Sequence, residues 1–334
     1  MEPVHDDPTT DRLDGLRGLA DATLEALVVP SFTRIGYDVR RRLFDWSPLD
    51  ELSMRDKVVA VTGATSGLGE LTATTLARMG AEVLLLARNE RKAEAARERI
   101  AAAAGPERAR TYLVDMSDLG AVRAVVEEIR GAEPRLDVLV NNAGALLGTR
   151  ETSVDGYELT FATMVLGPFA LTEGLLPLLR ERDDARVITV TSGGMYAQSL
   201  HLDDLQFERE PYRGSVAYAR AKRAQVVLTR LWARRYRGTS VRFHAMHPGW
   251  AETPGFEASL PRFYRVIGPL ARTPEQGVDT IVWLAASAQG AASSGRLWLD
   301  RRPRPFDKLP GTRVSAREAA ELWEACERLT SATG

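Results

Sequence analysis

Residues 57–80 read KVVAVTGATSGLGELTATTLARMG, and this stretch decides the fold. Its first six residues form an apolar run typical of a buried strand, and its last twelve have helical periodicity and end in a glycine. Between them, Gly63, Gly67 and Gly69 form a G-x-x-x-G-x-G pattern. Glycines let a backbone turn tightly beside a pyrophosphate, and a helix N-terminus offers free N–H groups. The strand–loop–helix context therefore predicts a dinucleotide site, although any tight turn also needs glycine.

The same alternation of apolar runs and helical stretches continues along the chain. We expect strands at 81–87, 111–114, 136–141, 186–191 and 241–246, and helices at 90–105, 118–131, 154–179 and around Tyr218. Strands this apolar must be covered on both faces, so the sequence predicts one doubly wound parallel α/β sheet (a Rossmann fold) with helices on both faces. We assign residues 54–300 to this domain, 1–53 to a partly helical N-terminal extension and 301–334 to a C-terminal tail with one helix.

Composition limits the class of protein. The 334 residues are 44% hydrophobic and 27% charged, with a net charge of −1, which is typical of a soluble globular protein and gives no reason to expect nucleic acid as a partner. The single cysteine, Cys326, excludes an internal disulfide and favours a cytoplasmic location. We find no signal peptide, and no apolar run approaching the roughly 18 residues of a membrane span.

The N-terminal extension has a different composition. We expect residues 1–25, which are acidic and contain prolines, to be frayed, and residues 24–46 to form short amphipathic helices. Two interpretations remain open. The extension is either an arm packed on the domain or on a subunit partner, or an interfacial helix that touches a membrane surface.

Cofactor choice depends on the end of the second strand. An NAD site usually has an acidic residue there, which binds the ribose 2′-hydroxyl. This chain has Arg88 instead, 25 residues after Gly63. An arginine favours a 2′-phosphate, so the sequence predicts NADP(H) in preference to NAD(H). The alternative is that Arg88 is one surface arginine among many in an arginine-rich chain.

A tyrosine and a lysine share one helix face. Tyr218 and Lys222 are four residues apart, and Lys222 is one of only four lysines in the chain. An ammonium nearby, together with an oxidised nicotinamide, would lower the pKa of the phenol and let it exchange a proton with a carbonyl or hydroxyl group. Ser192 follows a predicted strand, where an open α/β sheet places its ligands, and its hydroxyl is suited to bond the substrate oxygen. Simple turn chemistry would also explain a serine there.

Together these motifs resemble the short-chain dehydrogenase/reductase family. The glycine-rich loop, NNAG at Asn141–Gly144, Ser192, the Tyr218/Lys222 pair and HPGWAET at 247–253 occur in the family's order, and the likeness covers about residues 57–299. Residues 190–208, MHPGWAETPG at 246–255 and DRRPRP at 300–305 resemble more narrowly its branch of member-12 and retinol-dehydrogenase-like enzymes.

The resemblance implies a role for each matched residue. Tyr218 would donate and accept the proton, Lys222 would lower its pKa and hold the nicotinamide ribose, and Ser192 would orient the carbonyl. Asn141 would stabilise the central strand. The implied cofactor-binding residues are Thr62, Gly63, Thr65, Ser66, Gly67, Leu68, Gly69, Arg88, Asp115, Met116, Asn142, Ala143, Gly144, Tyr218, Lys222, Pro248, Gly249 and Thr253.

One position departs from the family pattern. Met164 stands in FATMVLG, where the family has a catalytic asparagine that anchors a water linked to the lysine. A thioether is a weak acceptor and donates nothing. His244 and His247 are three apart on a strand and its exit, so we expect them on different faces and predict no metal site.

These observations predict an NADP(H)-dependent oxidoreductase that interconverts a carbonyl and an alcohol, with an apolar aldehyde or ketone as the substrate partner. A lid at 255–270 would border its pocket. The alternative is a nucleotide-binding regulatory or scaffold protein with little turnover, which Met164 favours. Members of the family commonly pair through the helix that holds the tyrosine, so a homo-oligomer is also open.

Overall fold

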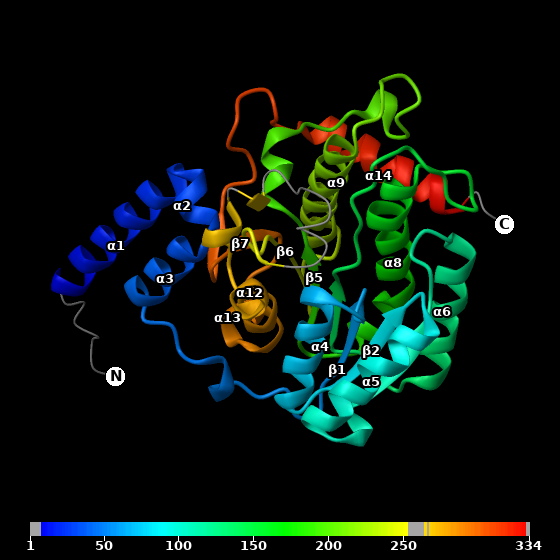
Figure 1. The fold of residues 1–334 in the computed structure, drawn as a ribbon, viewed down its shortest axis with the longest axis horizontal. Coiled ribbons are helices and arrows are strands. Elements are labelled where there is room, and N and C mark those ends of the chain that lie inside the picture. Colours follow the sequence, from blue (N-terminus) through cyan, green and yellow to red (C-terminus); the bar gives the residue numbers. More distant parts are fainter. Residues whose placement is uncertain (1–7, 253–263, 266, 332–334) are drawn as a thin grey trace.

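The computed structural model describes residues 8–252, 264–265 and 267–331, and its centre is one eight-stranded sheet in the order β3-β2-β1-β4-β5-β6-β7-β8 (Figure 1). Strands β1 to β7 are parallel, which confirms the predicted fold class. Strand β8 pairs antiparallel with β7, an edge that the sequence did not predict. The strands are β1 (Val58–Thr62), β2 (Glu82–Ala87), β3 (Ala109–Leu113), β4 (Val138–Asn141), β5 (Ala185–Val190), β6 (Val241–Met246), β7 (Arg296–Leu299) and β8 (Arg302–Arg304).

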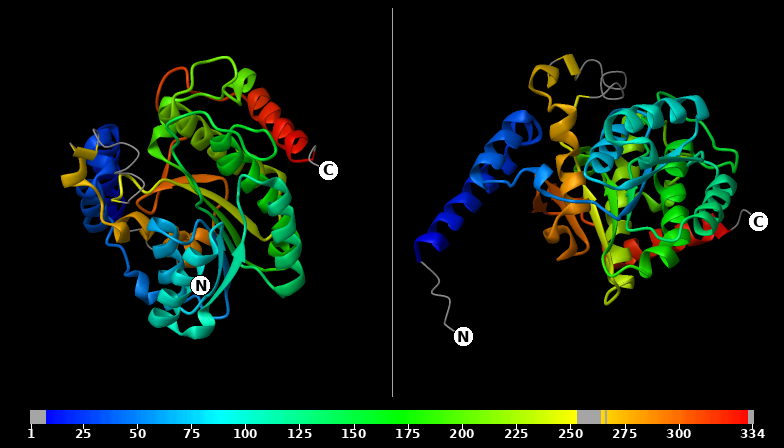
Figure 2. Two further views of the ribbon diagram at one scale, coloured as in Figure 1. Left: turned by 45° about the vertical axis from the view of Figure 1, so that its right-hand side comes forward. Right: turned by 90° about the horizontal axis from the view of Figure 1, so that it is seen from below.

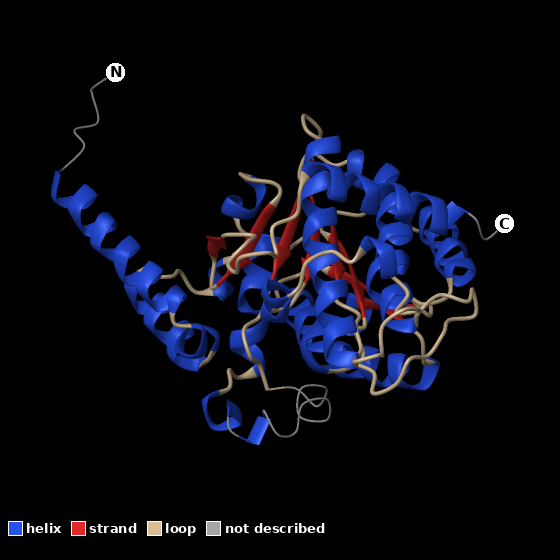
Figure 3. Ribbon diagram, turned by 90° about the horizontal axis from the view of Figure 1, so that it is seen from above, coloured by secondary structure: helices blue, strands red, loops and turns tan. Residues whose placement is uncertain are grey.

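Helices cover both faces of this sheet (Figure 3). One core lies under α4 (Gly67–Arg78), α5 (Glu90–Ala104) and α12 (Pro274–Ala286), and the other under α6 (Leu119–Ala132), α8 (Gly167–Arg180) and α9 (Gly214–Arg235). Alternate residues of β1 enter opposite cores, as the period of a strand requires. The shorter helices are α7 (Leu159–Phe161), α13 (Ala288–Ala291), a π-helical turn Ala162–Leu166, and 3₁₀ turns at Leu49–Glu51, Pro106–Arg108, Gly193–Ala197, Leu202–Asp204 and Gly268–Leu270.

The strand order places the candidate site. The chain moves outward from β1 to β2 and β3, then returns to the other side of β1 with β4. Ligands of open α/β sheets bind outside the carboxyl ends of the strands at such a reversal. The loops after β1 and β4 therefore meet at the place where a dinucleotide is expected.

The predicted helix at 154–179 begins later than the sequence suggested. Glu158 caps it by accepting from the Thr160 and Phe161 N–H groups, so the helix starts at Leu159. It runs through the π-helical turn into α8. By length and composition, Leu159–Arg180 is apolar enough to cross a membrane, contrary to our reading of the sequence. Since 72% of its most apolar window is buried in the protein, it has the character of a core helix.

The N-terminal extension forms three helices, α1 (Pro8–Ala26), α2 (Val28–Phe32) and α3 (Arg34–Leu43). The frayed segment expected up to residue 25 is therefore helical from Pro8 onward, and residues 1–7 lie outside the described part. We call residues 8–46 the arm. The start of α1 projects away from the body, whereas α2 and α3 lie against it (Figures 1 and 2).

The C-terminal tail contributes to both the sheet and a core. Beyond residue 300 it adds β8, and then α14 (Ala316–Ser331). Trp323 of α14 packs against Phe169 of α8 and Trp232 of α9, with ring centroids 4.9 and 5.9 Å apart. Cys326 is buried in the same cluster. The tail thus covers part of the helix that holds Tyr218.

Candidate active site

The glycine-rich loop after β1 forms a tight turn at the carboxyl edge of the sheet. Gly63 has a φ of +65° and Gly67 a φ of +55°, values that residues with a side chain rarely adopt. A Cβ atom on Gly69 would lie 2.3 Å from the Gly63 carbonyl oxygen, so the third glycine lets α4 pack directly on the loop. The other predicted residues of this loop remain at least partly exposed: Thr65, Ser66 and Leu68.

The first turn of α4 has backbone donors that no capping side chain satisfies. Ser66 is the N-cap residue, but its side chain makes no capping bond, whereas Asn89 caps α5 and Asp118 caps α6. The Glu70 carboxylate in this turn is held by Arg99 at 2.5 Å. Free N–H groups and the helix dipole fit the pyrophosphate of a dinucleotide.

Thr62 ties the two central loops together. Its Oγ1 accepts hydrogen bonds from the N–H groups of Asn142 and Ala143, both at 2.9 Å. The Asn142 side chain donates back to the Thr62 carbonyl oxygen at 2.9 Å. Asn141, at the end of β4, donates to Thr172 Oγ1 on α8 at 3.0 Å. The loop after β4 is therefore held beside the glycine-rich loop, where the resemblance places the cofactor.

The residues predicted to contact the adenosine half lie after β2 and β3. Arg88 directly follows β2 and is exposed, and no ion pair holds its guanidinium among the described residues. Asp115 accepts from the N–H and hydroxyl groups of Ser117, at 2.9 and 2.7 Å. Met116 is buried, and its carbonyl oxygen would lie 2.0 Å from a Cβ atom on Gly167, which explains a glycine at that point of the long helix.

The predicted catalytic side chains come together at the end of β5. The Ser192 hydroxyl lies beside the Tyr218 phenol, close enough to lower its pKa, and it accepts from the Gly194 N–H at 3.4 Å. Lys222 Nζ donates to the Val190 carbonyl oxygen at 2.7 Å and lies 5.5 Å from the centre of the Tyr218 ring. A strand end and one face of α9 thus bring a hydroxyl, a phenol and an amine to one place.

Burial controls the titration of these groups. It raises the pKa of Tyr218 to about 12, against a smaller lowering by the neighbouring Ser192 hydroxyl, and it lowers the pKa of Lys222 to about 7. The expected lowering of the phenol pKa by the ammonium is therefore not found in the protein without cofactor. The physical reason is that both groups lose water, while the amine bonds a carbonyl oxygen rather than the phenol.

Met164 lies beside the lysine in the π-helical turn. It is fully buried, and a Cβ atom on Gly144 would lie 3.5 Å from its sulfur and 3.7 Å from Lys222 Nζ. Its carbonyl oxygen accepts from Gln225 Nε2 at 2.7 Å, and Gln225 Oε1 has no partner among the described residues. Gln225 was not predicted from the sequence, where it is only one more polar residue on a helix.

The loop after β6 carries Pro248 and Gly249. Gly249 has a φ of +73°, and a Cβ atom there would lie 2.4 Å from Arg272 Nε and 2.6 Å from the Phe32 carbonyl oxygen. The predicted Thr253 lies outside the described residues, as does most of the predicted lid, at 255–263 and 266. Phe32 and Arg272 were missed because no sequence motif relates the arm to this loop.

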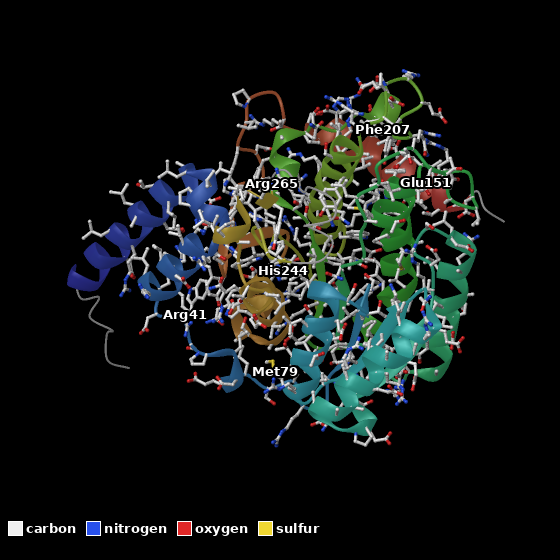
Figure 4. The ribbon with its side chains drawn as sticks, viewed as in Figure 1. Arg41, Met79, Glu151, Phe207, His244 and Arg265 are labelled. Atoms are coloured by element: carbon white, nitrogen blue, oxygen red, sulfur yellow. The ribbon has the colours of Figure 1, made fainter. Side chains whose placement is uncertain are left out.

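The two histidines of this region occupy different surroundings. His244, labelled in Figure 4, bonds Gly290 O through Nε2 at 2.8 Å and accepts from Trp298 Nε1 through Nδ1 at 3.0 Å. His247 is buried with its ring against Phe32, centroids 4.7 Å apart. Burial lowers the pKa of both imidazoles, that of His244 to about 4, so His244 is a neutral core residue with both ring nitrogens occupied.

Known proteins match this chain along most of its length. Residues 57–261 match the family profile described as short chain dehydrogenase. Human dehydrogenase/reductase SDR family member 12 is 42% identical over 89% of this chain and 93% of its own length. Mouse retinol dehydrogenase 14 is 35% identical over 82% of this chain and 86% of its own length. Among solved structures, an uncharacterised protein of Mycobacterium paratuberculosis has a TM-score of 0.69 and 29% identity, over 86% of this chain and 97% of its own. A short chain dehydrogenase of Escherichia coli CFT073 in complex with NADPH has a TM-score of 0.63 and 25% identity, and the match covers 77% of this chain and 100% of that one.

Proposed function

Since the chain belongs to the short-chain dehydrogenase/reductase family and is an oxidoreductase of carbonyl and CH–OH groups, we propose that it interconverts apolar aldehydes or ketones with their alcohols and prefers NADP(H) to NAD(H). The observation that carries the proposal is that Ser192 at the end of β5 lies beside the Tyr218 phenol, with Lys222 one helical turn away and its Nζ 5.5 Å from the centre of the Tyr218 ring. A bound reduced nicotinamide supplies the hydride, and the chain supplies the proton.

Each catalytic side chain has one task. During reduction Tyr218 donates its phenolic proton to the carbonyl oxygen, and during oxidation it takes a proton from the alcohol. Because burial raises the pKa of Tyr218 to about 12, the phenol is protonated at neutral pH and ready to donate. Ser192 donates a hydrogen bond to the same oxygen and fixes its direction. When protonated, Lys222 provides the positive charge that reduces the cost of the phenolate left behind.

Cofactor preference is proposed on Arg88. Its exposed guanidinium, at the end of β2, is available for charge-assisted hydrogen bonds to a 2′-phosphate, which NADP(H) has and NAD(H) lacks. The NADPH bound by the Escherichia coli relative supports the same choice. The uncapped first turn of α4 would hold the pyrophosphate, and the loops that carry Asn142 and Gly249 would border the nicotinamide.

Substrate class is proposed from two observations. The mouse relative is named for retinol, an apolar alcohol. The loop after β5 is also apolar in character, because Met195 and Tyr196, which follow Ser192 in the chain, are buried in a hydrophobic cluster with Phe32. We therefore propose a hydrophobic carbonyl compound as the substrate rather than a charged metabolite.

Location and assembly form part of the same proposal. One buried cysteine, Cys326, supports a cytoplasmic protein.

Exposed apolar side chains gather on the arm, and they support a peripheral contact with a membrane surface. These are Leu16, Leu19, Leu27, Val28, Val29, Ile35 and Val39. Sedimentation with phosphatidylserine vesicles, for the wild type and for Leu16→Glu/Leu19→Glu, tests the contact, and sedimentation velocity tests whether copies of the chain pair.

The decisive experiment is a turnover assay. The purified protein, NADPH or NADH, and a panel of apolar and charged aldehydes and ketones are mixed, and loss of reduced nicotinamide is followed. We expect turnover with apolar carbonyls and NADPH. Tight NADPH binding without turnover on any member of the panel would favour the alternative, a nucleotide-binding regulatory protein, for which Met164 in the position of the family's asparagine is the supporting observation.

A further inference from the structure

A phenylalanine of the arm lies against the loop that carries the catalytic serine. Phe32 is buried at the end of α2, and a Cβ atom on Gly193 would lie 2.4 Å from Cε2 of its ring. Gly193 directly follows Ser192. The ring therefore occupies the space that a side chain at position 193 would need, and the backbone of the serine loop rests on it.

The same phenylalanine also holds the loop after β6. Its carbonyl oxygen accepts from the Trp250 N–H at 2.8 Å and from Arg272 Nε at 3.1 Å. Its ring packs edge-on against His247 and Trp250, with centroids 4.7 and 5.6 Å apart. One residue of the arm thus contacts both loops that flank the catalytic end of the sheet, the Ser192 loop after β5 and the Pro248–Gly249 loop after β6.

Buried charges keep this residue in place. Arg40, on α3, donates to Asp21 of α1 and to Asp300, which follows β7, both at 2.7 Å. Arg272 donates to Asp300 at 2.8 Å and to the carbonyl oxygen of Ser31, next to Phe32, at 2.9 Å. A buried cluster with this many bonds can be satisfied in few arrangements, so it fixes the position of α2 relative to the sheet.

From these contacts we infer that Phe32 is a positioning residue of the active site: it holds the Ser192 loop and the Pro248–Gly249 loop in the arrangement that hydride transfer needs. This inference rests on the proposed function. The arm is then part of the catalytic unit, although it lies outside the segment 57–261 that matches the family profile. Because the ring supports the loops without touching the reacting atoms, its loss should lower kcat more than it weakens cofactor binding.

The first test compares three variants of the arm. In Phe32→Ala, kcat should fall roughly 10- to 100-fold, because misplacement by about an ångström is enough for such losses. The dissociation constant of NADPH should change by less than about threefold. Phe32→Leu, which keeps apolar bulk against Gly193, should recover most of the rate. Phe44→Ala is the matched control, because this ring belongs to the arm but stacks on Arg302, 4.1 Å from its guanidinium carbon; its kcat should stay at the wild-type value.

A second test uses the close approach directly. Gly193→Ala puts a methyl group where the Phe32 ring lies, so it should lower kcat in the wild-type background. In the double variant Phe32→Ala/Gly193→Ala the space is free, and the combined loss should be smaller than the product of the two single losses. Losses that multiply would show that the two residues act independently, and would contradict the contact as the cause.

A third readout does not depend on turnover. Hydrogen exchange of the amides at 191–197 and 247–250 should be faster in Phe32→Ala than in the wild type, and unchanged in Phe44→Ala. Wild-type protein without turnover on any carbonyl would refute the proposed function, while the exchange data would still test the positioning. A folded Phe32→Ala variant with wild-type kcat and wild-type exchange in both segments would overturn the inference.

Discussion

Replacing Arg40 by methionine should detach the arm and destabilise the protein. Arg40 is fully buried, and its guanidinium makes five hydrogen bonds, to Asp21, Glu25, Asp300 and twice to Ser31. Breaking a buried ion pair by removing one partner costs about 3–5 kcal/mol. Each carboxylate here keeps another cation, so we expect the lower end, about 3 kcal/mol. These remaining pairs are Asp21 with Arg304, Glu25 with Lys308, and Asp300 with Arg272.

The assay is urea unfolding followed by circular dichroism, together with limited proteolysis of the arm. Arg40→Met should lower the midpoint and expose the arm to cleavage before the body. Arg17→Met is the control, because Arg17 lies on the same arm in an exposed pair with Asp14 at 3.3 Å, and exposed pairs are worth about 0–1 kcal/mol. If Arg40→Met stays within about 0.5 kcal/mol of the wild type with an uncleaved arm, the cluster does not hold the arm, and the reasoning fails.

Acid should act on the same cluster. Burial raises the pKa of Asp21, but the hydrogen bonds and charges of Arg304 and Arg40 outweigh it, so the pKa of Asp21 lies below its ordinary value. A carboxyl with a lowered pKa contributes stability that is present above its unfolded pKa, about 4, and is lost as pH falls through the folded pKa. The arm should therefore detach below about pH 4 in the wild type, with a weaker acid dependence in Arg40→Met.

Three further predictions concern the site. Arg88→Asp should weaken NADPH binding and abolish or reverse the preference over NADH, and equal dissociation constants for both cofactors in the wild type would contradict the assignment. If a missing proton relay limits the rate, Met164→Asn should raise kcat at similar cofactor affinity. A buried amide without hydrogen-bond partners at this position would instead lower the free energy of unfolding by about 1–3 kcal/mol. Unchanged turnover in a folded, cofactor-loaded variant would refute the relay. Burial lowers the pKa of Lys222 to about 7, whereas the amine of the unfolded chain titrates near its ordinary value of about 10.5. Between these two pH values the unfolded chain therefore binds one proton more than the folded protein, and the free energy of unfolding should rise with pH by up to about 1.4 kcal/mol per pH unit. In Lys222→Met this contribution to the slope should be absent. Parallel slopes from urea titrations at pH 7 and 9 would show that Lys222 is not buried as described.

Much of the fold could be predicted from the sequence because its signals are local. An apolar strand, a glycine-rich turn and a helix follow one another between Val58 and Arg78, and the repeated alternation allows few arrangements other than a doubly wound sheet. Ser192 and the pair on α9 were found for a similar reason, because the strand end and the four-residue spacing determine where their side chains lie.

The rest depends on contacts between distant parts of the chain. Residues up to 25 are acidic and resemble a frayed end, yet Asp21 is buried and bonded to Arg304, 283 positions later in the chain, and α1 begins at Pro8. No local sequence pattern predicts the antiparallel strand β8 or the contact between Phe32 and the backbone at Gly193. The raised pKa of Tyr218 in the protein without cofactor could not be predicted either, since burial is a tertiary property that a neighbouring lysine in the sequence does not reveal.

The turnover of Tyr218→Phe tests the central claim most directly. The substitution keeps the ring and removes the proton that the phenol donates, so with NADPH and an accepted carbonyl substrate kcat should fall by about 10²–10⁴, the usual contribution of a general acid. The dissociation constant of NADPH, measured by fluorescence on the same preparation, should stay close to the wild-type value. A folded Tyr218→Phe variant that binds NADPH and turns over at the wild-type rate would contradict the assignment of the catalytic proton to this residue.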